Sequence, residues 1–190
     1  MAISRKHVED LATLRAYAHP LRWRLLAALR VYGPATASEL GRRFGETSGA
    51  TSYHLRQLAR FGFITEDEDQ PSRRERRWRA AHEATTWSTA DFLDDPEARA
   101  AVDVIKRDFL RYHTEAVQGW YAEQAQWPRE WVDAAVSTDL YFRLRPADLA
   151  ELNRELREVL ERYRDRPADD PQAARVLLFL EAFPTREVRL

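Results

Sequence analysis

Short stripes of apolar residues, separated by proline and glycine, organise the first third of this chain of 190 residues. Within residues 10–62 the apolar side chains recur at three and four residues, as in Leu21, Leu25 and Leu29, which indicates amphipathic helices. Pro20 can begin a helix, whereas Gly33-Pro34 ends one. The spacing therefore predicts four short helices between about residue 10 and residue 61.

Local signals place the ends of the third and fourth helices. Thr36 and Glu39 have the spacing of a capping box, and Gly45 closes the helix that they begin. The fourth helix is predicted over 48–61, and Gly62 suits the left-handed position that follows a helix. The turn between these two helices has only a few residues.

A hairpin is predicted after the fourth helix. Phe63, Ile64 and Thr65 favour a strand, residues 66–72 favour a turn, and residues 73–80 return with Trp78 as the anchor. Four helices followed by a hairpin are the outline of a winged helix-turn-helix. We therefore predict a mainly α fold with a small β component.

Two strings in this region resemble one family of regulators. AHPLRWRLLAAL resembles the entry helix of ArsR-like regulators, and ATASELGRRFGETSGATSYHLRQLARFGFIT resembles their helix-turn-helix and the start of the wing. The most specific part is SYHLRQL, residues 52–58, and the resemblance covers about residues 8–82. It implies DNA binding by the fourth helix, which enters the major groove in that family. The chain has no cysteine, so the metal-sensing motifs of the family are absent.

The fourth helix has two different faces. Thr51, Leu55 and Leu58 share a stripe that should face the core, while Ser52 and Arg56 lie on the opposite face. Small residues allow close approach to DNA, and arginine and glutamine side chains can read guanine and adenine edges. From the helix alone, an alternative of equal weight is that this face only contacts solvent and binds nothing. The candidate DNA contacts on this helix and at the start of the preceding one are Thr36, Ser48, Gly49, Ser52, Tyr53, His54, Arg56, Gln57 and Arg60.

Arginines in the predicted wing give a second set of DNA contacts. A phosphate-contacting arm is one interpretation, but acidic residues balance the arginines over residues 66–79. The alternative is a hairpin whose strands pair opposite charges across the ladder. The candidate wing contacts are Arg74, Arg76, Arg77 and Arg79.

His54, on the fourth helix, also has two interpretations. The alternative to DNA contact is a structural role as a hydrogen-bonding residue.

Charge and composition divide the chain into two regions. Residues 1–90 carry 15 Lys and Arg against 10 Asp and Glu, whereas residues 91–190 carry 15 against 21. A basic front and an acidic back suggest two separate roles. We predict a winged helix-turn-helix DNA-binding domain over 1–83 and a C-terminal region over 84–190 for dimerisation or effector binding. With no cysteine, no apolar run near the roughly 18 residues of a membrane helix and no signal core, we expect a cytoplasmic protein without membrane contact.

A long amphipathic helix is predicted over about 96–126. An amphipathic helix that follows a small DNA-binding domain is commonly a dimerisation element; the alternative is packing within its own chain. Alternation over 138–145, a helix from Pro146, and an apolar run over 175–183 then predict a strand–helix–strand unit, a small α/β element. The candidate dimerisation residues are Ile105, Phe109, Tyr112, Ala116 and Trp120.

The expected function is a homodimeric transcription regulator that binds a double-stranded DNA operator, with repression by family analogy. No glycine-rich phosphate loop, nucleophile elbow or histidine–carboxylate metal motif is visible, so we expect no enzyme activity, no cofactor and no metal. The aromatic residues around the long helix either line an effector pocket for a small molecule or belong to core or interface. A protein-interaction adaptor with the same fold is the alternative function.

Overall fold

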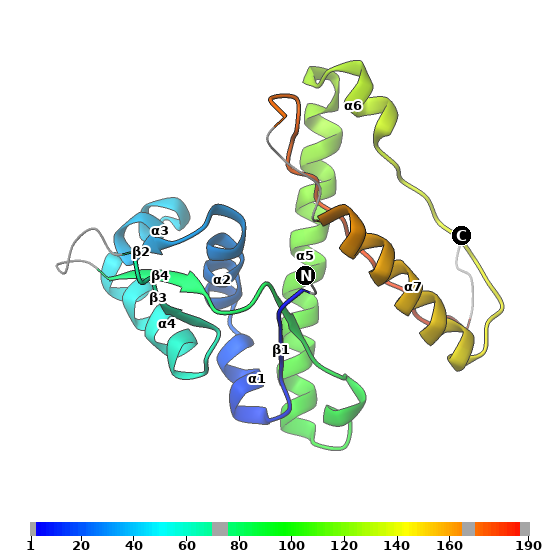
Figure 1. The fold of residues 1–190 in the computed structure, drawn as a ribbon. Coiled ribbons are helices and arrows are strands. Elements are labelled where there is room, and N and C mark those ends of the chain that lie inside the picture. Colours follow the sequence, from blue (N-terminus) through cyan, green and yellow to red (C-terminus); the bar gives the residue numbers. More distant parts are fainter. Residues whose placement is uncertain (1–2, 70–75, 165–169, 187–190) are drawn as a thin grey trace. The chain divides into compact units, whose positions relative to one another are not determined.

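A computed structural model describes residues 3–69, 76–164 and 170–186 and divides the chain into two compact units (Figure 1). The first unit is Ile3–Thr114 and the second holds the described residues from Glu115 onward. The long helix α5, Pro96–Glu123, begins in the first unit and ends in the second. The first unit therefore includes residues 84–114 in addition to the predicted winged helix-turn-helix domain over 1–83.

The first unit contains the predicted helices and hairpin, which confirms the mainly α winged helix-turn-helix fold. In chain order its elements are β1 Arg5–His7, α1 Leu11–Tyr17, α2 Pro20–Tyr32, β2 Ala35–Thr36, α3 Ala37–Phe44, α4 Ser48–Arg60, β3 Ile64–Glu66, β4 Arg77–Ala80, β5 Ala84–Thr86, the 3-10 turn Ala90–Phe92 and the first part of α5.

The helix ends follow the local sequence signals. Pro20 is the first residue of α2, and the His19 side chain caps that helix by accepting a hydrogen bond from the Leu21 N–H at 3.2 Å. Thr36 and Glu39 form the predicted capping box on α3. Gly45 and Gly62 have φ of 70° and 69°, the left-handed conformation that glycine adopts without a steric penalty.

Two small sheets complete the first unit. The wing is the antiparallel sheet β2–β4–β3, with Trp78 on β4 opposite Ala35 on β2. Strands β1 and β5 form a parallel pair that the sequence did not predict. Each has only three residues, too few for alternation to show. The predicted contact Arg74 lies outside the described residues.

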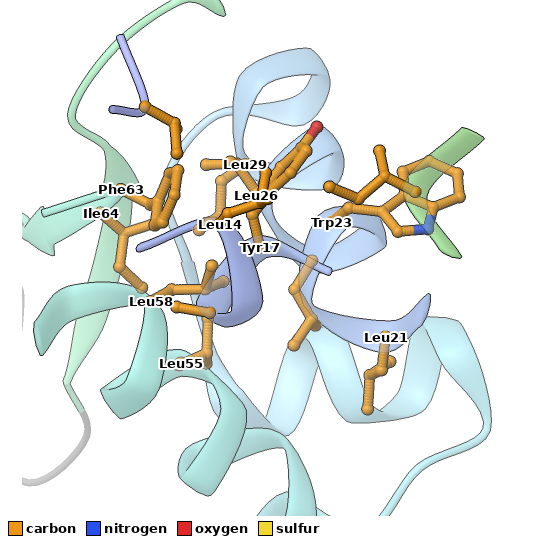
Figure 2. Close-up of a cluster of buried hydrophobic side chains, with 14 of the residues drawn as sticks. Leu14, Tyr17, Leu21, Trp23, Leu26, Leu29, Leu55, Leu58, Phe63 and Ile64 are labelled. Carbon is orange, nitrogen blue, oxygen red and sulfur yellow. The ribbon is translucent and has the colours of Figure 1, made fainter. Parts of the chain in front are cut away.

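One apolar core holds the first unit together. Figure 2 shows side chains of α1, α2, α4 and β3 converging, among them Leu14, Leu26, Leu55 and Ile64, together with Phe63 just before β3. Tyr17 stacks on Phe63 with ring centroids 5.5 Å apart. Trp78 is also buried, as predicted for the anchor of the wing.

The start of α5 belongs to the same core. Ala98, Val102 and Ile105 are each 1% exposed. The ring of Phe109 packs edge-on against that of Trp23 at 5.4 Å. Ile105 is therefore part of the core of its own chain, and the half-buried Phe109 packs against that core. Packing within the chain accounts for this part of α5, and a dimer interface at these residues stays a prediction.

The second unit has helices but no sheet among its described residues. After the end of α5 come the 3-10 turn Gln124–Gln126, α6 Arg129–Ala134 and α7 Pro146–Arg164. Residues 138–145 and 175–183 form no strand, so the predicted small α/β element is wrong for the single chain. A strand needs a hydrogen-bonded neighbour, and sequence alternation does not supply one. Among the described residues from Glu115 onward, none is buried.

The remaining predicted dimerisation residues lie along the second half of α5. The Tyr112 ring packs on Trp23 at 5.4 Å and is 39% exposed, while Ala116 and Trp120 are half-buried. The Trp120 ring lies 6.3 Å from that of Trp127. No helix in the described part of the chain has the length and apolar character required to cross a bilayer.

Candidate nucleic-acid interface

A tight turn joins α3 to α4 and fixes the angle between them. The Glu46 N–H donates to the Gly41 carbonyl at 2.9 Å. A Cβ on Gly41 would lie 2.8 Å from the Glu46 carbonyl oxygen and 3.3 Å from Thr51 Oγ1. Position 41 therefore favours glycine, because the backbone of the turn leaves too little room for a side chain there.

The two faces of α4 are those that the sequence predicted. Thr51, Leu55 and Leu58 are fully buried and attach the helix to the core. On the other face Tyr53 is 52% exposed and Arg56 is also exposed. Of the other predicted contacts, Ser48, Gly49 and Arg60 are exposed at the helix ends, and Ser52 and Gln57 are half-buried. The structure thus brings most of these residues together on one accessible surface.

Helix α4 carries only neutral and basic side chains. Its 13 residues include two arginines and one histidine but no aspartate or glutamate. No hydrogen bond or ion pair joins Arg56 to another residue within the described ranges. A guanidinium that is exposed and uncommitted can donate to a phosphate or to a guanine edge.

A hollow of about 340 Å³ lies between the start of α3, the start of α4 and the wing. Its described lining residues are rich in hydroxyl and guanidinium groups and include no carboxylate. Such groups are the usual partners of phosphate oxygens in DNA. The lining residues are Thr36, Ala37, Ser38, Ser48, Ser52, Arg56, Arg76 and Trp78.

The wing arginines are engaged with acidic residues of the hairpin. Arg76 lies 3.2 Å from Glu66 and Arg79 lies 3.2 Å from Glu68. Arg77 donates a hydrogen bond to the Pro34 carbonyl at 2.7 Å and lies 3.7 Å from Asp67. The alternative of cross-strand charge pairing therefore describes these three arginines, although exposed ion pairs are weak and exchange readily.

Thr36 and His54, two of the predicted DNA contacts, have structural roles. Thr36 is buried, and its hydroxyl accepts the hydrogen bond from the Glu39 N–H that caps α3. The His54 ring lies against the His19 ring with centroids 4.4 Å apart. Burial, with a further contribution from Arg22, lowers the pKa of His54. Both residues thus position α3 and α4.

Ser38 is the residue of this surface that the sequence did not single out. It follows the capping residue Thr36 by two positions and lines the hollow beside Ser48 and Ser52. The signal that identifies it is its position at the start of α3, where backbone N–H groups attract anions. No cluster of three or more His, Asp or Glu side chains suited to a metal ion occurs in the ranges that the structure describes.

Residues 17–67 match the family of helix-turn-helix domains. This stretch runs from the end of α1 to the wing and includes both α3 and α4. The chain therefore contains a helix-turn-helix domain, within which α3 and α4 are the consecutive helices joined by the tight turn. The comparison with curated proteins gave no match.

Several solved structures are similar to the chain at low sequence identity. A double mutant of ZitR from Lactococcus lactis, in its apo form, is 10% identical, with 77% of this chain and 83% of that one covered and a TM-score of 0.34. The transcriptional regulator Tm0710 from Thermotoga maritima is 15% identical over 82% and 90%, with a TM-score of 0.32. NMB1585, a MarR family regulator from Neisseria meningitidis, is 17% identical over 78% and 76%, with a TM-score of 0.29.

Proposed function

We propose that the protein is a sequence-specific, DNA-binding transcription regulator that acts as a homodimer. Helix α4 enters the major groove and the wing lies along the flanking backbone. The single observation that carries this proposal is the exposed, acid-free face of α4, where Arg56 stands beside the hydroxyl-lined hollow.

The surface suits DNA because two kinds of contact are available side by side. The hollow offers hydroxyls and Arg76 to a phosphate, which would fix the register of the protein on the duplex. Arg56 and Gln57 offer donors to base edges, which would supply sequence preference. The helix-turn-helix match over residues 17–67 supports the same docking geometry.

The finer features of the proposal come from the sequence. The resemblance of SYHLRQL to ArsR-like regulators supports that subtype and a repressor that blocks polymerase. Two copies would place two α4 helices in successive major grooves, about 34 Å apart. The second unit would supply the contact between copies and a place for a small-molecule effector, and a protein of this kind acts in the cytoplasm without enzymatic activity.

Fluorescence anisotropy tests the proposal. Full-length protein is titrated into labelled duplex from its own upstream DNA at several salt concentrations, with random duplex as the control. We expect tight, sequence-selective binding whose affinity falls steeply as salt rises, since each phosphate contact releases counterions. Equal, weak binding to both duplexes, together with no enriched site in a genomic selection, would contradict the proposal.

A protein-interaction adaptor is the second candidate function, and the wing is the observation that favours it. Its arginines at 76, 77 and 79 already lie beside Glu66, Asp67 and Glu68, so the wing adds little net charge for phosphate. In the same titration an adaptor would show no salt-dependent binding to any duplex. The exposed face of α4 would then be a protein-contact surface.

A further inference from the structure

Three helices of the first unit meet at His19, the residue that caps α2. Its ring lies against the ring of His54 on α4, with centroids 4.4 Å apart. Burial has the largest effect on the pKa of His19 and lowers it, as do Arg22 and His54, whereas the negative charge of Asp108 on α5 opposes them. Because Asp108 is only 7% exposed, solvent screens its charge little. The imidazole of His19 therefore contacts α4 and is also within electrostatic reach of a buried carboxylate on α5.

Several polar atoms of this cluster are buried without a hydrogen-bond partner in the described part of the chain. They include His54 Nδ1, Arg22 Nε and Asp108 Oδ2. The other oxygen of Asp108, Oδ1, accepts a hydrogen bond from Arg111 at 2.8 Å, so Oδ2 is the oxygen that stays open. A buried carboxylate oxygen that accepts no hydrogen bond costs free energy, and a charged donor would remove that cost. Asp108 Oδ2 is therefore an unused acceptor near His19.

The protonation state of His19 decides which partner its ring can bind. In the neutral ring, Nδ1 accepts the hydrogen bond from the Leu21 N–H at 3.2 Å and thereby caps α2. Protonation places a hydrogen on Nδ1, so the ring loses its acceptor and can no longer cap the helix. The charged ring can instead donate to Asp108 Oδ2, and such a charge-assisted bond is stronger than the neutral bond that it replaces. A neutral ring therefore favours α2, and a charged ring favours α5.

The surrounding charges favour a proton on His19 over a proton on His54. Burial and Arg22 disfavour a charge on either ring. Among the described groups, the carboxylates of Asp108 and Glu46 favour a charge on His19, and that of Glu46 favours one on His54. A charge on one ring also repels a charge on the other. The pair therefore takes up a single proton first, and His19 has more carboxylates to stabilise it.

Movement of the His19 ring towards α5 would remove the ring that packs against His54. The neighbours of His54 along α4 are Tyr53, which is 52% exposed and whose ring lies 5.2 Å away, and Leu55, which is fully buried. A change in the position of His54 would therefore also change that of Tyr53 on the exposed face. The orientation of this face of α4 consequently depends on where the His19 ring lies.

We propose that the ring of His19 moves from His54 to Asp108 when it binds a proton, and that this movement weakens DNA binding in mild acid. The inference rests on the proposed DNA-binding function. Its direction is opposite to the ordinary effect of acid, because protonation of surface histidines adds positive charge and strengthens binding to a polyanion. Weaker binding at lower pH is therefore the signature of this proton switch.

Fluorescence anisotropy at two pH values and constant salt tests the switch, with full-length protein and duplex from its own upstream DNA. For the wild type we expect an affinity about tenfold lower at about pH 5.5 than at about pH 7.5, the change when DNA binding expels one proton over one pH unit. His19→Asn keeps a residue that caps helices but cannot titrate, and Asp108→Asn removes the carboxylate that attracts the charged ring. Both variants should lose the decrease. His82→Asn, at a half-buried histidine of the same unit outside the cluster, is the matched control and should retain it.

Two further measurements separate the possible failures. Circular dichroism should show folded protein at both pH values, and unfolding in acid would overturn the switch, because the affinity would then fall with the fold itself. No decrease in the wild type, or a decrease that persists in His19→Asn and Asp108→Asn, would also overturn it. If no duplex binds at either pH, the DNA-binding proposal fails, and an NMR titration of the His19 ring decides the switch without DNA. A lower pKa of His19 in Asp108→Asn than in the wild type supports the pairing with Asp108, and an unchanged pKa overturns it.

Discussion

The imidazole of His54 on α4 lies against the imidazole of His19, the residue that caps α2, with ring centroids 4.4 Å apart. Burial lowers the pKa of both side chains, and the positive charge of Arg22 lowers each further. His54 also lowers the pKa of His19. Smaller opposing effects come from Asp108 and Glu46 at His19 and from Glu46 at His54. His19 Nδ1 also accepts the hydrogen bond from the Leu21 N–H, which only a neutral imidazole can do. The contact between α2 and α4 therefore depends on two uncharged rings.

The first prediction concerns pH. Because both pKa values lie below the ordinary value of about 6.5, the folded state binds fewer protons than the unfolded state. The stabilisation is fully present above that value and is lost as the pH falls through it. Urea unfolding should therefore show a lower midpoint at about pH 5.5 than at about pH 7.5. His54→Gln should reduce this difference, and parallel pH profiles for the variant and the wild type would contradict the assignment.

The second prediction concerns Arg56. If the guanidinium reads a base edge, Arg56→Ala should weaken operator binding by about 1–3 kcal/mol and relax the preference for sequence. If it contacts phosphate alone, the loss should be equal on all sequences and the salt dependence should become shallower. Anisotropy on operator and random duplex distinguishes these results. Arg162→Ala, on α7 in the second unit, is the control and should leave both affinities unchanged.

The third prediction compares two glycines. Gly41→Ala should destabilise the protein, because its Cβ would lie 2.8 Å from a backbone oxygen in the turn between α3 and α4. At Gly49, on the first turn of α4, nothing lies within 4 Å of an added Cβ. Gly49→Ala should therefore stabilise the helix by about 0.5–1 kcal/mol, measured by urea unfolding.

The DNA affinity of these two variants gives a second test. Since a methyl group at position 49 would stand between the start of α4 and the duplex, Gly49→Ala should bind DNA more weakly although it is more stable. Unchanged affinity would show that position 49 does not approach DNA. A stable, normally folded Gly41→Ala protein would contradict the close packing of the two helices.

The fourth prediction concerns α5. Ile105→Ala should lower the free energy of unfolding by about 2–5 kcal/mol, because this side chain is 1% exposed within its own chain. Leu110→Ala, further along the same helix and 64% exposed, should change it by less than about 0.5 kcal/mol. Thermal or urea unfolding supplies both values. Similar effects at the two positions would argue against this packing of α5.

The fifth prediction concerns the wing. Glu66→Gln removes the carboxylate that lies 3.2 Å from Arg76, which also lines the hollow. If the hollow receives a phosphate, the variant should bind DNA more tightly at low salt, and the gain should diminish as salt rises. Glu158→Gln on α7 changes the net charge equally and is the control. No gain over that control would favour the adaptor.

The parts of the fold that the sequence could predict are those fixed by local chemistry. Thr36 with Glu39, Pro20, Gly45 and Gly62 mark helix ends through contacts within a few residues, and the structure confirms each. The inward and outward faces of α4 follow in the same way from helical periodicity. The apolar side of α5 was also visible in the sequence.

The element that covers an apolar face lies far from that face in the sequence, so local patterns could not predict it. The same spacing at Ile105 and Phe109 fits a dimer interface or an internal core, and the structure shows the core. The alternation at residues 138–145 indicates a strand, but it cannot supply the neighbouring strand. The sequence of the wing likewise shows that acidic and basic residues balance, but only the structure shows which arginine lies beside which carboxylate.

Thr36 belongs to two elements at once. As a residue of β2 it pairs with Arg77 on β4, and as the cap of α3 it holds the first turn of that helix through its hydroxyl. Strand β2 of the wing sheet therefore runs directly into α3 with no linker between them. A displacement of the wing by a bound duplex would therefore also move the start of α3, so the two elements would bind or leave DNA together.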